Sequence, residues 1–382
     1  GEVASIVVAL VNPGPRSLEV QLREALHPSL ARAPLHETLS LAPGTSDEWT
    51  YSLRPRRRGR MSWGPLTARL LGPLGLAWTQ RDLIDAADAR VYPRVRWGGR
   101  VGKLLALAQR HQLGQSPTRA VGEGAEPYAL RTYRRGDPPR KIHWRASARH
   151  GRLISREETW EQGARLVLLL DCGRSMASTD DDRSKLDHSL AAALALLRLA
   201  NGRGDRVTVV AYSDRIERRI RVRPGVAGIR SAYQELFDLR ARRVESDHIL
   251  AVEAAVTLEP RRSVAVFCTS VTDLATSERL IDAIERLRRR HQTLLVNLED
   301  PRVAARAASR PVLIEEAFAK ISAMEIQLAN RDLGRRLSGR GVTTVTTAAD
   351  RLALETLDAY LGVMERSSRS RSAGRLLRSA SS

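Results

Sequence analysis

The sequence is poor in cysteine, lysine, aromatic residues and long apolar runs. Its 382 residues contain two cysteines, Cys172 and Cys268, without paired spacing, which excludes a disulfide scaffold and a structural zinc site. We therefore expect reduced thiols. No apolar run approaches the roughly 20 residues that cross a bilayer. The chain starts at Gly1 without a signal-peptide pattern, so we expect a fragment or processed form whose true N-terminus, with any membrane anchor, lies outside it.

Basic charge is abundant but comes almost entirely from arginine. Four of the 63 basic residues are lysines, and the formal net charge is +20. Between residues 93 and 165, 16 basic residues stand against six acidic ones, a difference of +10. This localised excess favours an acidic partner or an anionic membrane surface over nucleic acid, because no aromatic-interleaved module accompanies it. Electrostatic binding of anionic lipid or nucleic acid stays open as an alternative function.

The chain also lacks the common catalytic motifs. Neither Gly-x-Ser-x-Gly nor a P-loop is present, and no nucleophile is tied to His143 by a recognised pattern. A Gly-Asp-Pro-Pro turn at 136–139 lies between strand-like segments at 128–133 and 153–155, which predicts a hairpin or tight crossover. We interpret this region as a packed junction between domains, with no catalytic residues.

Four regions follow from the pattern of apolar segments. Residues 1–92 alternate short apolar segments with turn signals, which predicts an immunoglobulin-like β-sandwich of about seven strands. The arginine cluster at 54–60 should be solvated between two of these strands. Residues 93–165 form a basic connector, with helical periodicity at 101–111. Residues 365–382, mostly serine and arginine, are predicted to be a disordered tail.

Residues 166–364 alternate strand and helix, which predicts a doubly wound, mainly parallel α/β sheet. The expected strands are 166–170, 206–212, 216–222, 264–269, 293–298 and 342–345. The expected helices are 184–201, 226–239, 247–258, 276–289, 315–336 and 349–364. Such sheets bind ligands at the carboxyl ends of their strands, where Asp171 lies.

Asp171 and Ser175 follow the first parallel strand and offer hard oxygen ligands suited to Mg²⁺ or Mn²⁺. Asp273, with Thr269 and Ser270, follows another strand and could complete a metal site. A Mg²⁺-dependent enzyme or metal-dependent ligand binder at Asp171 is thus a second alternative. The competing interpretation is that Asp171 accepts backbone N–H groups of its own loop.

The central stretch resembles the signature of the domain-of-unknown-function 58 family. The matching signature residues are Arg131, Tyr133, Gly136, Asp137, His143, Trp144 and Arg149. Further matches are Asn12, the 57–59 run, 73–76 and 92–93. The resemblance implies a von Willebrand factor A-like domain preceded by an immunoglobulin-like domain. The A-domain metal pattern Asp-x-Ser-x-Ser reads Asp171, Gly173 and Ser175 here, so the middle hydroxyl is missing.

The same resemblance implies a role beside MoxR-type AAA+ ATPases. Family members often carry two N-terminal membrane helices, so it also implies membrane association with the soluble part in the cytoplasm. Our leading hypothesis is a non-enzymatic adaptor that binds the ATPase, its client protein, or both, in protein complex assembly or maturation.

Overall fold

A computed structural model provides the structure of the chain. It describes residues 3–28, 30, 35–72, 75–93, 98–114, 127–132, 147–149, 151, 153–158, 164–180 and 183–379. Among the signature residues, Arg131 lies in strand β8 (Pro127–Thr132) and Arg149 lies exposed in a short helical segment. Five others lie outside the described residues: Tyr133, Gly136, Asp137, His143 and Trp144.

The first 91 residues fold into two antiparallel sheets. Strands β1 and β4 form one sheet; the other has the order β3-β2-β5-β6, with β7 also paired to β5. The bounds are β1 (Ala4–Val11), β2 (Leu18–Leu26), β3 (Leu35–Leu41), β4 (Ser46–Leu53), β5 (Gly59–Leu71), β6 (Trp78–Ile84) and β7 (Ala87–Val91). The sheets share a core, in which Leu10 and Trp49 of the first pack with Val20, Leu22 and Leu66 of the second. The predicted all-β character of this region is thus confirmed, and we call it the β domain.

Residues from 165 onward form a six-stranded sheet in the order β14-β13-β10-β15-β16-β17. All neighbouring strands are parallel except β14, which runs antiparallel to β13 at one edge. The bounds are β10 (Arg165–Asp171), β13 (Arg206–Tyr212), β14 (Ile216–Val222), β15 (Val264–Thr269), β16 (Gln292–Leu298) and β17 (Thr343–Thr347). Strand β10 therefore occupies an interior position, as its unbroken apolar sequence predicts.

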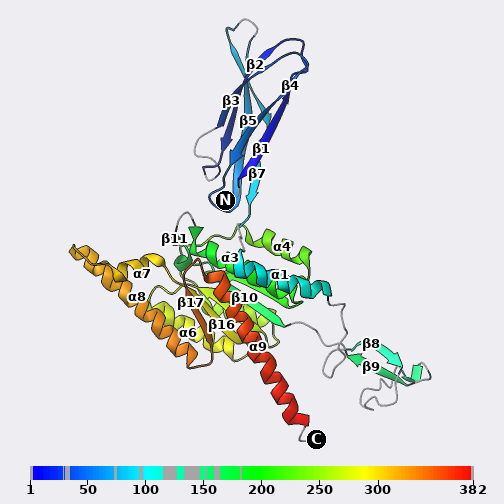
Figure 1. The fold of residues 1–382 in the computed structure, drawn as a ribbon, viewed down its shortest axis with the longest axis vertical. Helices are drawn as coiled ribbons and strands as arrows, with labels where there is room; N and C mark the ends of the chain where they lie inside the picture. The colour runs from blue at the N-terminus through cyan, green and yellow to red at the C-terminus, as the bar shows by residue number, and fades with distance from the viewer. Residues whose placement is uncertain are drawn as a thin grey trace.

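Helices cover both faces of this sheet (Figure 1). One face packs against α1 (Gly99–Gly114), α3 (Lys185–Gly202), α4 (Val226–Leu236) and α9 (Leu352–Ser379). The other face packs against α5 (His248–Leu258), α6 (Leu274–Arg288) and α8 (Ile314–Ser338). Along β10, Leu168 and Leu170 enter the first core, whereas Val167 and Leu169 enter the second. This alternation is what a strand buried on both sides requires.

Several elements differ from the sequence prediction. A short helix that we did not predict, α7 (Pro301–Ala308), starts with proline at its first position and is capped by Asp300, whose Oδ1 accepts from the Arg302 N–H at 3.0 Å. Helix α9 continues to Ser379, although residues 365–382 are predicted to be disordered. Its extension contains no proline and begins from a turn already anchored in the core, so each added residue gains a backbone hydrogen bond without a new nucleus.

The predicted hairpin in the connector is present as an antiparallel pair of β8 and β9 (Ile154–Glu158), which lies to one side of the α/β sheet (Figure 1). The Gly-Asp-Pro-Pro turn itself lies outside the described residues.

One arginine of the 54–60 cluster is not solvated, contrary to the prediction. The Arg58 side chain is 8% exposed; its Nε lies 2.5 Å from Asp187 Oδ1 at the start of α3. Its Nη1 donates to the Phe237 carbonyl at 2.8 Å, and the Tyr92 and Phe237 rings lie 5.2 Å apart. Charge alone predicted solvent exposure, but the ion pair and the carbonyl compensate for burial. Arg58 thus joins the β domain to the α/β sheet.

Candidate functional site

The carboxyl end of β10 places Asp171 beside the end of β15. The Asp171 side chain is buried, and its two oxygens accept three hydrogen bonds from three loops. Oδ1 accepts from the Gly173 N–H at 2.8 Å and from the Ser246 hydroxyl at 2.5 Å. Oδ2 accepts from the Thr269 hydroxyl at 2.5 Å. Asp171 therefore ties the first strand loop to the loops before α5 and after β15.

Ser246 also explains why residue 173 is glycine. A Cβ atom on Gly173 would lie 2.0 Å from Ser246 Oγ and 3.0 Å from the Val244 carbonyl oxygen, and contacts below 3.0 Å require a shift. The backbone of Gly173 has φ −80°, so the requirement is steric and not conformational. Ser246, which is 75 residues from Asp171 in sequence, thus brings a hydroxyl to Asp171 next to the position where residue 173 lacks one.

The other predicted metal residues lie in separate roles. Ser175 is half-buried in the 3₁₀ turn η2 (Arg174–Met176). Asp273 caps α6, and its Oδ1 accepts from the Thr276 N–H at 2.7 Å. Burial would raise the pKa of Asp273, but hydrogen bonds from Thr276 and Thr272 outweigh it and lower the pKa below its ordinary value.

These residues do not fit a Mg²⁺ or Mn²⁺ site as they are arranged. Such ions need carboxylate oxygens free to coordinate them. Both Asp171 oxygens already accept hydrogen bonds from the protein, and Asp273 Oδ1 caps its own helix. The part of the chain that the structure describes contains no group of three or more His, Cys, Asp or Glu side chains placed to hold a metal ion.

A buried lysine that the sequence analysis overlooked lies near the carboxyl ends of the parallel strands, which we call the carboxyl-end rim. Lys185, the first residue of α3, donates from Nζ to Ser270 Oγ at 3.0 Å and lies 3.4 Å from Asp300 Oδ2. Ser178 also donates to Asp300 Oδ2, at 2.9 Å. Burial lowers the pKa of Lys185 more than Asp300 raises it. For Asp300, burial acts to raise the pKa, but Lys185 and the hydrogen bonds lower it overall. In this ion pair the Lys185 ammonium group lies where it would repel a second cation.

Lys185 and Ser175 line one cavity of 160 Å³ at the carboxyl-end rim. Thr272 and Asp300 line it from the strand loops, and Ile326 and Asn330 line it from α8. Three of its polar groups, Lys185, Asp300 and Ser178, are paired with one another and hold the loops in place. This cavity connects the rim to α8.

Helix α8 and the two residues before it carry a row of exposed apolar side chains. Exposure reaches 89% for Val312 and 67% for Phe318. The row, which we call the α8 stripe, consists of Val312, Leu313, Ile314, Phe318, Ile321, Met324 and Leu328. Leu333 and Leu337, farther along the helix, face the core instead. Exposed apolar patches on soluble monomers often mark interaction sites, and this row of seven large apolar side chains is a candidate for one.

Sequence reasoning identified this helix but not its exposed face. The spacing of Ile314, Phe318, Ile321 and Leu328 is the signal that could have found it, because these residues share one side of a helix. The same spacing predicts a buried face equally well, so only the packing distinguishes the two.

The two cysteines are free and buried, as the sequence predicts for reduced thiols. Burial raises the pKa of both thiols to about 12. Neither is therefore a reactive thiolate at neutral pH.

Comparison with known proteins places the chain among bacterial relatives. It is 25% identical over 202 residues to the uncharacterized proteins Mb1516 of Mycobacterium bovis and Rv1480 of Mycobacterium tuberculosis (strain H37Rv). The match covers 52% of this chain and 62% of each relative, so the chain spans less than two thirds of their length. Among solved structures, it is similar to the SpRpn10 VWA domain, with a TM-score of 0.30 and 11% identity, over 52% of this chain and 94% of that domain.

A family described as "Protein of unknown function DUF58" matches residues 129–320. This segment runs from β8 through five of the six strands of the sheet into α8, and includes Asp171, Lys185 and four of the seven residues of the α8 stripe. Since the match covers half of the chain and agrees with the signature residues, the chain belongs to the DUF58 family.

Proposed function

We propose that this protein is a non-enzymatic interaction protein that binds a partner protein on the α8 stripe and the adjoining carboxyl-end rim. The observation that carries the proposal is the exposure of seven apolar side chains in one row. Exposing this much apolar surface to water is unfavourable, and burial of such a row against a partner removes it from solvent.

The size of the surface supports a specific partner. A standard interface buries about 800 Å² on each side, and a row of seven exposed apolar side chains can form the centre of such an interface. Phe318, near its middle, is the type of residue on which binding energy concentrates, since aromatic anchors dominate well-packed interfaces.

The charge around the stripe favours a protein over an anionic lipid or nucleic acid. Residues 299–330 contain five acidic and four basic residues, a net charge of −1, in a chain whose net charge is +20. A polyanion would find its counter-charges elsewhere on the molecule. We therefore propose a protein partner that presents an apolar helix or loop to the α8 stripe.

We propose that this partner is a MoxR-type AAA+ ATPase, its client protein, or both, and that the complex works at the cytoplasmic side of a membrane. The support for this choice is the family resemblance carried by the signature residues. Within the described residues, no helix has the length and apolar character to span a bilayer.

The test is binding of the full chain to a purified MoxR-type ATPase encoded beside it, with Phe318→Asp as the variant. The matched control is Leu76→Asp, which makes the same change at an 84% exposed leucine in the β domain. We expect Phe318→Asp to weaken binding at least about tenfold, and Leu76→Asp to bind like wild type.

Three results would overturn the proposal. One is equal binding by Phe318→Asp and wild type, and another is no binding by wild type. The third is a wild-type dimer in light scattering that Phe318→Asp makes monomeric, since a second copy of this chain would then be what covers the stripe.

A further inference from the structure

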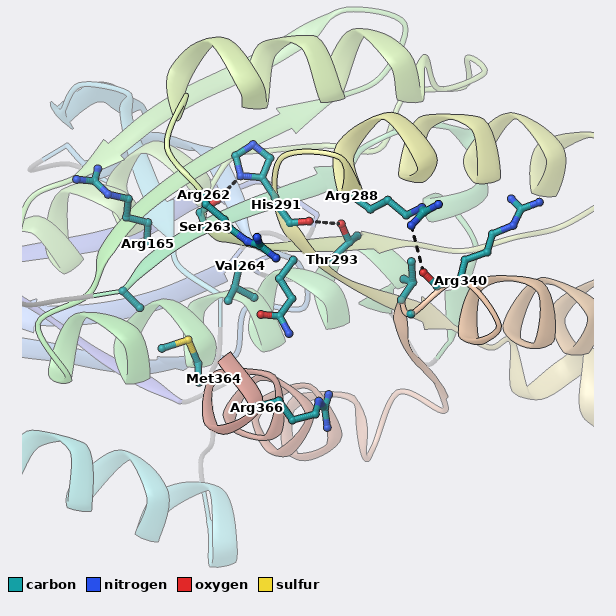
Figure 2. Close-up of a pocket in the computed structure, with 14 residues that line it drawn as sticks. Arg165, Arg262, Ser263, Val264, Arg288, His291, Thr293, Arg340, Met364 and Arg366 are labelled. Atoms are coloured by element: carbon teal, nitrogen blue, oxygen red, sulfur yellow. Dashed lines mark hydrogen bonds between the residues drawn. The ribbon is translucent and has the colours of Figure 1, made fainter. Parts of the chain in front are cut away.

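A second cavity, of 510 Å³, lies at the amino ends of the parallel strands, the end of the sheet opposite to Asp171 (Figure 2). Its floor comes from the first residues of β10, β15 and β16, and its walls come from the ends of α6 and of the core-packed part of α9. It shares no residue with the rim cavity or the α8 stripe. Any role of this cavity is therefore independent of the proposed protein interaction.

Arginine dominates the lining of this cavity. Five of its 14 lining residues are arginines: Arg165, Arg262, Arg288, Arg340 and Arg366. Segments far apart in sequence thus bring five guanidinium groups around one space. Arginines on an ordinary surface separate from one another because like charges repel.

Two carboxylates neutralise only part of this charge. Glu259 pairs with Arg165 at 3.1 Å. Glu285 pairs with both Arg288, at 2.6 Å, and Arg340, at 2.8 Å. Within the residues that the structure describes, these ion pairs engage three of the five guanidinium groups.

Arg262 and Arg366 are the arginines of this cavity that are most available to a ligand. Among the residues that the structure describes, neither pairs with a carboxylate; Arg366 Nη2 donates to the Thr343 hydroxyl at 3.0 Å. In Figure 2 the two lie on opposite sides of the pocket. Neither has to break an ion pair in order to contact a ligand.

His291 lines the cavity but adds no positive charge to it. Its ring is turned away from Arg366 (Figure 2), and its Nδ1 lies 2.6 Å from the Ser263 hydroxyl oxygen. Burial lowers the pKa of His291, so the imidazole is neutral at pH 7. The positive potential of the cavity therefore comes from arginine and does not vary with pH near neutrality.

We propose that this cavity binds a small phosphate-bearing anion, such as a nucleotide or a polyphosphate. The planar guanidinium fork matches phosphate oxygens bidentately, and several forks around one space match more than one phosphate group. The volume lies within the roughly 300–1,000 Å³ of small-molecule sites. Thr293 and Gln292 add neutral polar groups to the lining, as sites for polar ligands require.

The experiment measures binding of pyrophosphate and of ATP to the full chain by calorimetry and by thermal shift, at constant ionic strength. The variants are Arg262→Gln, Arg366→Gln and the double substitution. The matched control is Arg310→Gln, which removes an exposed arginine between α7 and α8. We expect binding by wild type and by the control, with about a tenfold loss for each single variant and a larger loss for the double variant.

Circular dichroism establishes that the variants are folded, which their exposed positions favour. The proposal is overturned if neither pyrophosphate nor ATP binds wild type, or if Arg310→Gln loses affinity as much as Arg262→Gln. It is also overturned if a short single-stranded DNA binds through Arg262 while pyrophosphate and ATP do not. Stabilisation by pyrophosphate that the double variant abolishes and the control retains establishes the site.

Discussion

Replacing Arg58 with methionine should uncouple the β domain from the α/β sheet. The substitution keeps an apolar stem of similar length and removes the guanidinium group that contacts Asp187 and the Phe237 carbonyl. The matched control is Arg57→Met, since Arg57 is exposed in the same loop. Both variants change the charge equally, so only the contacts differ.

The magnitude follows from how deeply each partner is buried. Removing one member of a buried ion pair costs about 3–5 kcal/mol, because the other charge is left uncompensated. Asp187 is 25% exposed and keeps its hydrogen bond from the Ser184 N–H at 2.8 Å, so solvent and the helix cap compensate part of that loss. We therefore expect a loss of about 2–3 kcal/mol, which corresponds to a fall in Tm of roughly 4–10 °C.

Urea denaturation followed by circular dichroism measures the loss, and small-angle scattering measures whether the two domains separate. Arg58→Met should lower the urea midpoint and increase the radius of gyration, while Arg57→Met should leave both near wild type. If the two variants agree within about 0.5 kcal/mol and in their radius of gyration, Arg58 does not join the domains and the reasoning from its burial is wrong.

Three further outcomes follow from buried groups. Gly173→Ala should destabilise the folded chain by about 1–3 kcal/mol, because the added Cβ displaces the Ser246 hydroxyl from Asp171. In a double-mutant cycle with Ser246→Ala, the double variant should lose less stability than the sum of the two single losses. Strictly additive losses would contradict this steric account. Burial lowers the pKa of His291, so the unfolded chain takes up a proton more readily and stability should fall as pH drops below about 6.5. The urea midpoints at pH 7.5 and 5.5 should therefore differ less in His291→Gln than in wild type. The same difference in both proteins would exclude His291 as the cause. Glu24→Ala should destabilise the β domain by about 2–4 kcal/mol, because its carboxylate accepts from Trp63 Nε1 at 2.5 Å; tryptophan fluorescence during denaturation measures this loss, and a change below about 0.5 kcal/mol would refute it.

Local patterns were sufficient for the elements of the fold. The β13, β14 and β15 segments begin and end where apolar alternation and turn residues place them, at 206–212, 216–222 and 264–269. The unbroken apolar run before Asp171 predicted a strand buried on both faces, and β10 does lie in the interior of the sheet. The helices that cover the sheet were likewise recognisable from their 3.6-residue periodicity.

The partners of the candidate site residues were decided only by the tertiary structure. Ser246 reaches Asp171 across 75 residues, and Lys185 meets Asp300 across 115 (300 minus 185). No periodicity encodes such pairs, because they depend on which loops converge at one end of the sheet. For that reason the sequence left a metal site at Asp171 open as an alternative, and the structure shows a network of protein donors there.

Exposure and charge were decided in the same way. The spacing of apolar residues along α8 defines a face, but whether water or protein covers that face depends on the packing of the other helices. Arg58 and Arg262 belong to similar basic stretches of sequence, yet one is buried against Asp187 and the other lines an arginine-rich cavity. The sequence by itself determined the strands, the helices and the total charge, because these depend on neighbouring residues. The tertiary structure decided which charges and apolar faces remain without a partner, because desolvation and pairing depend on segments that only folding brings together.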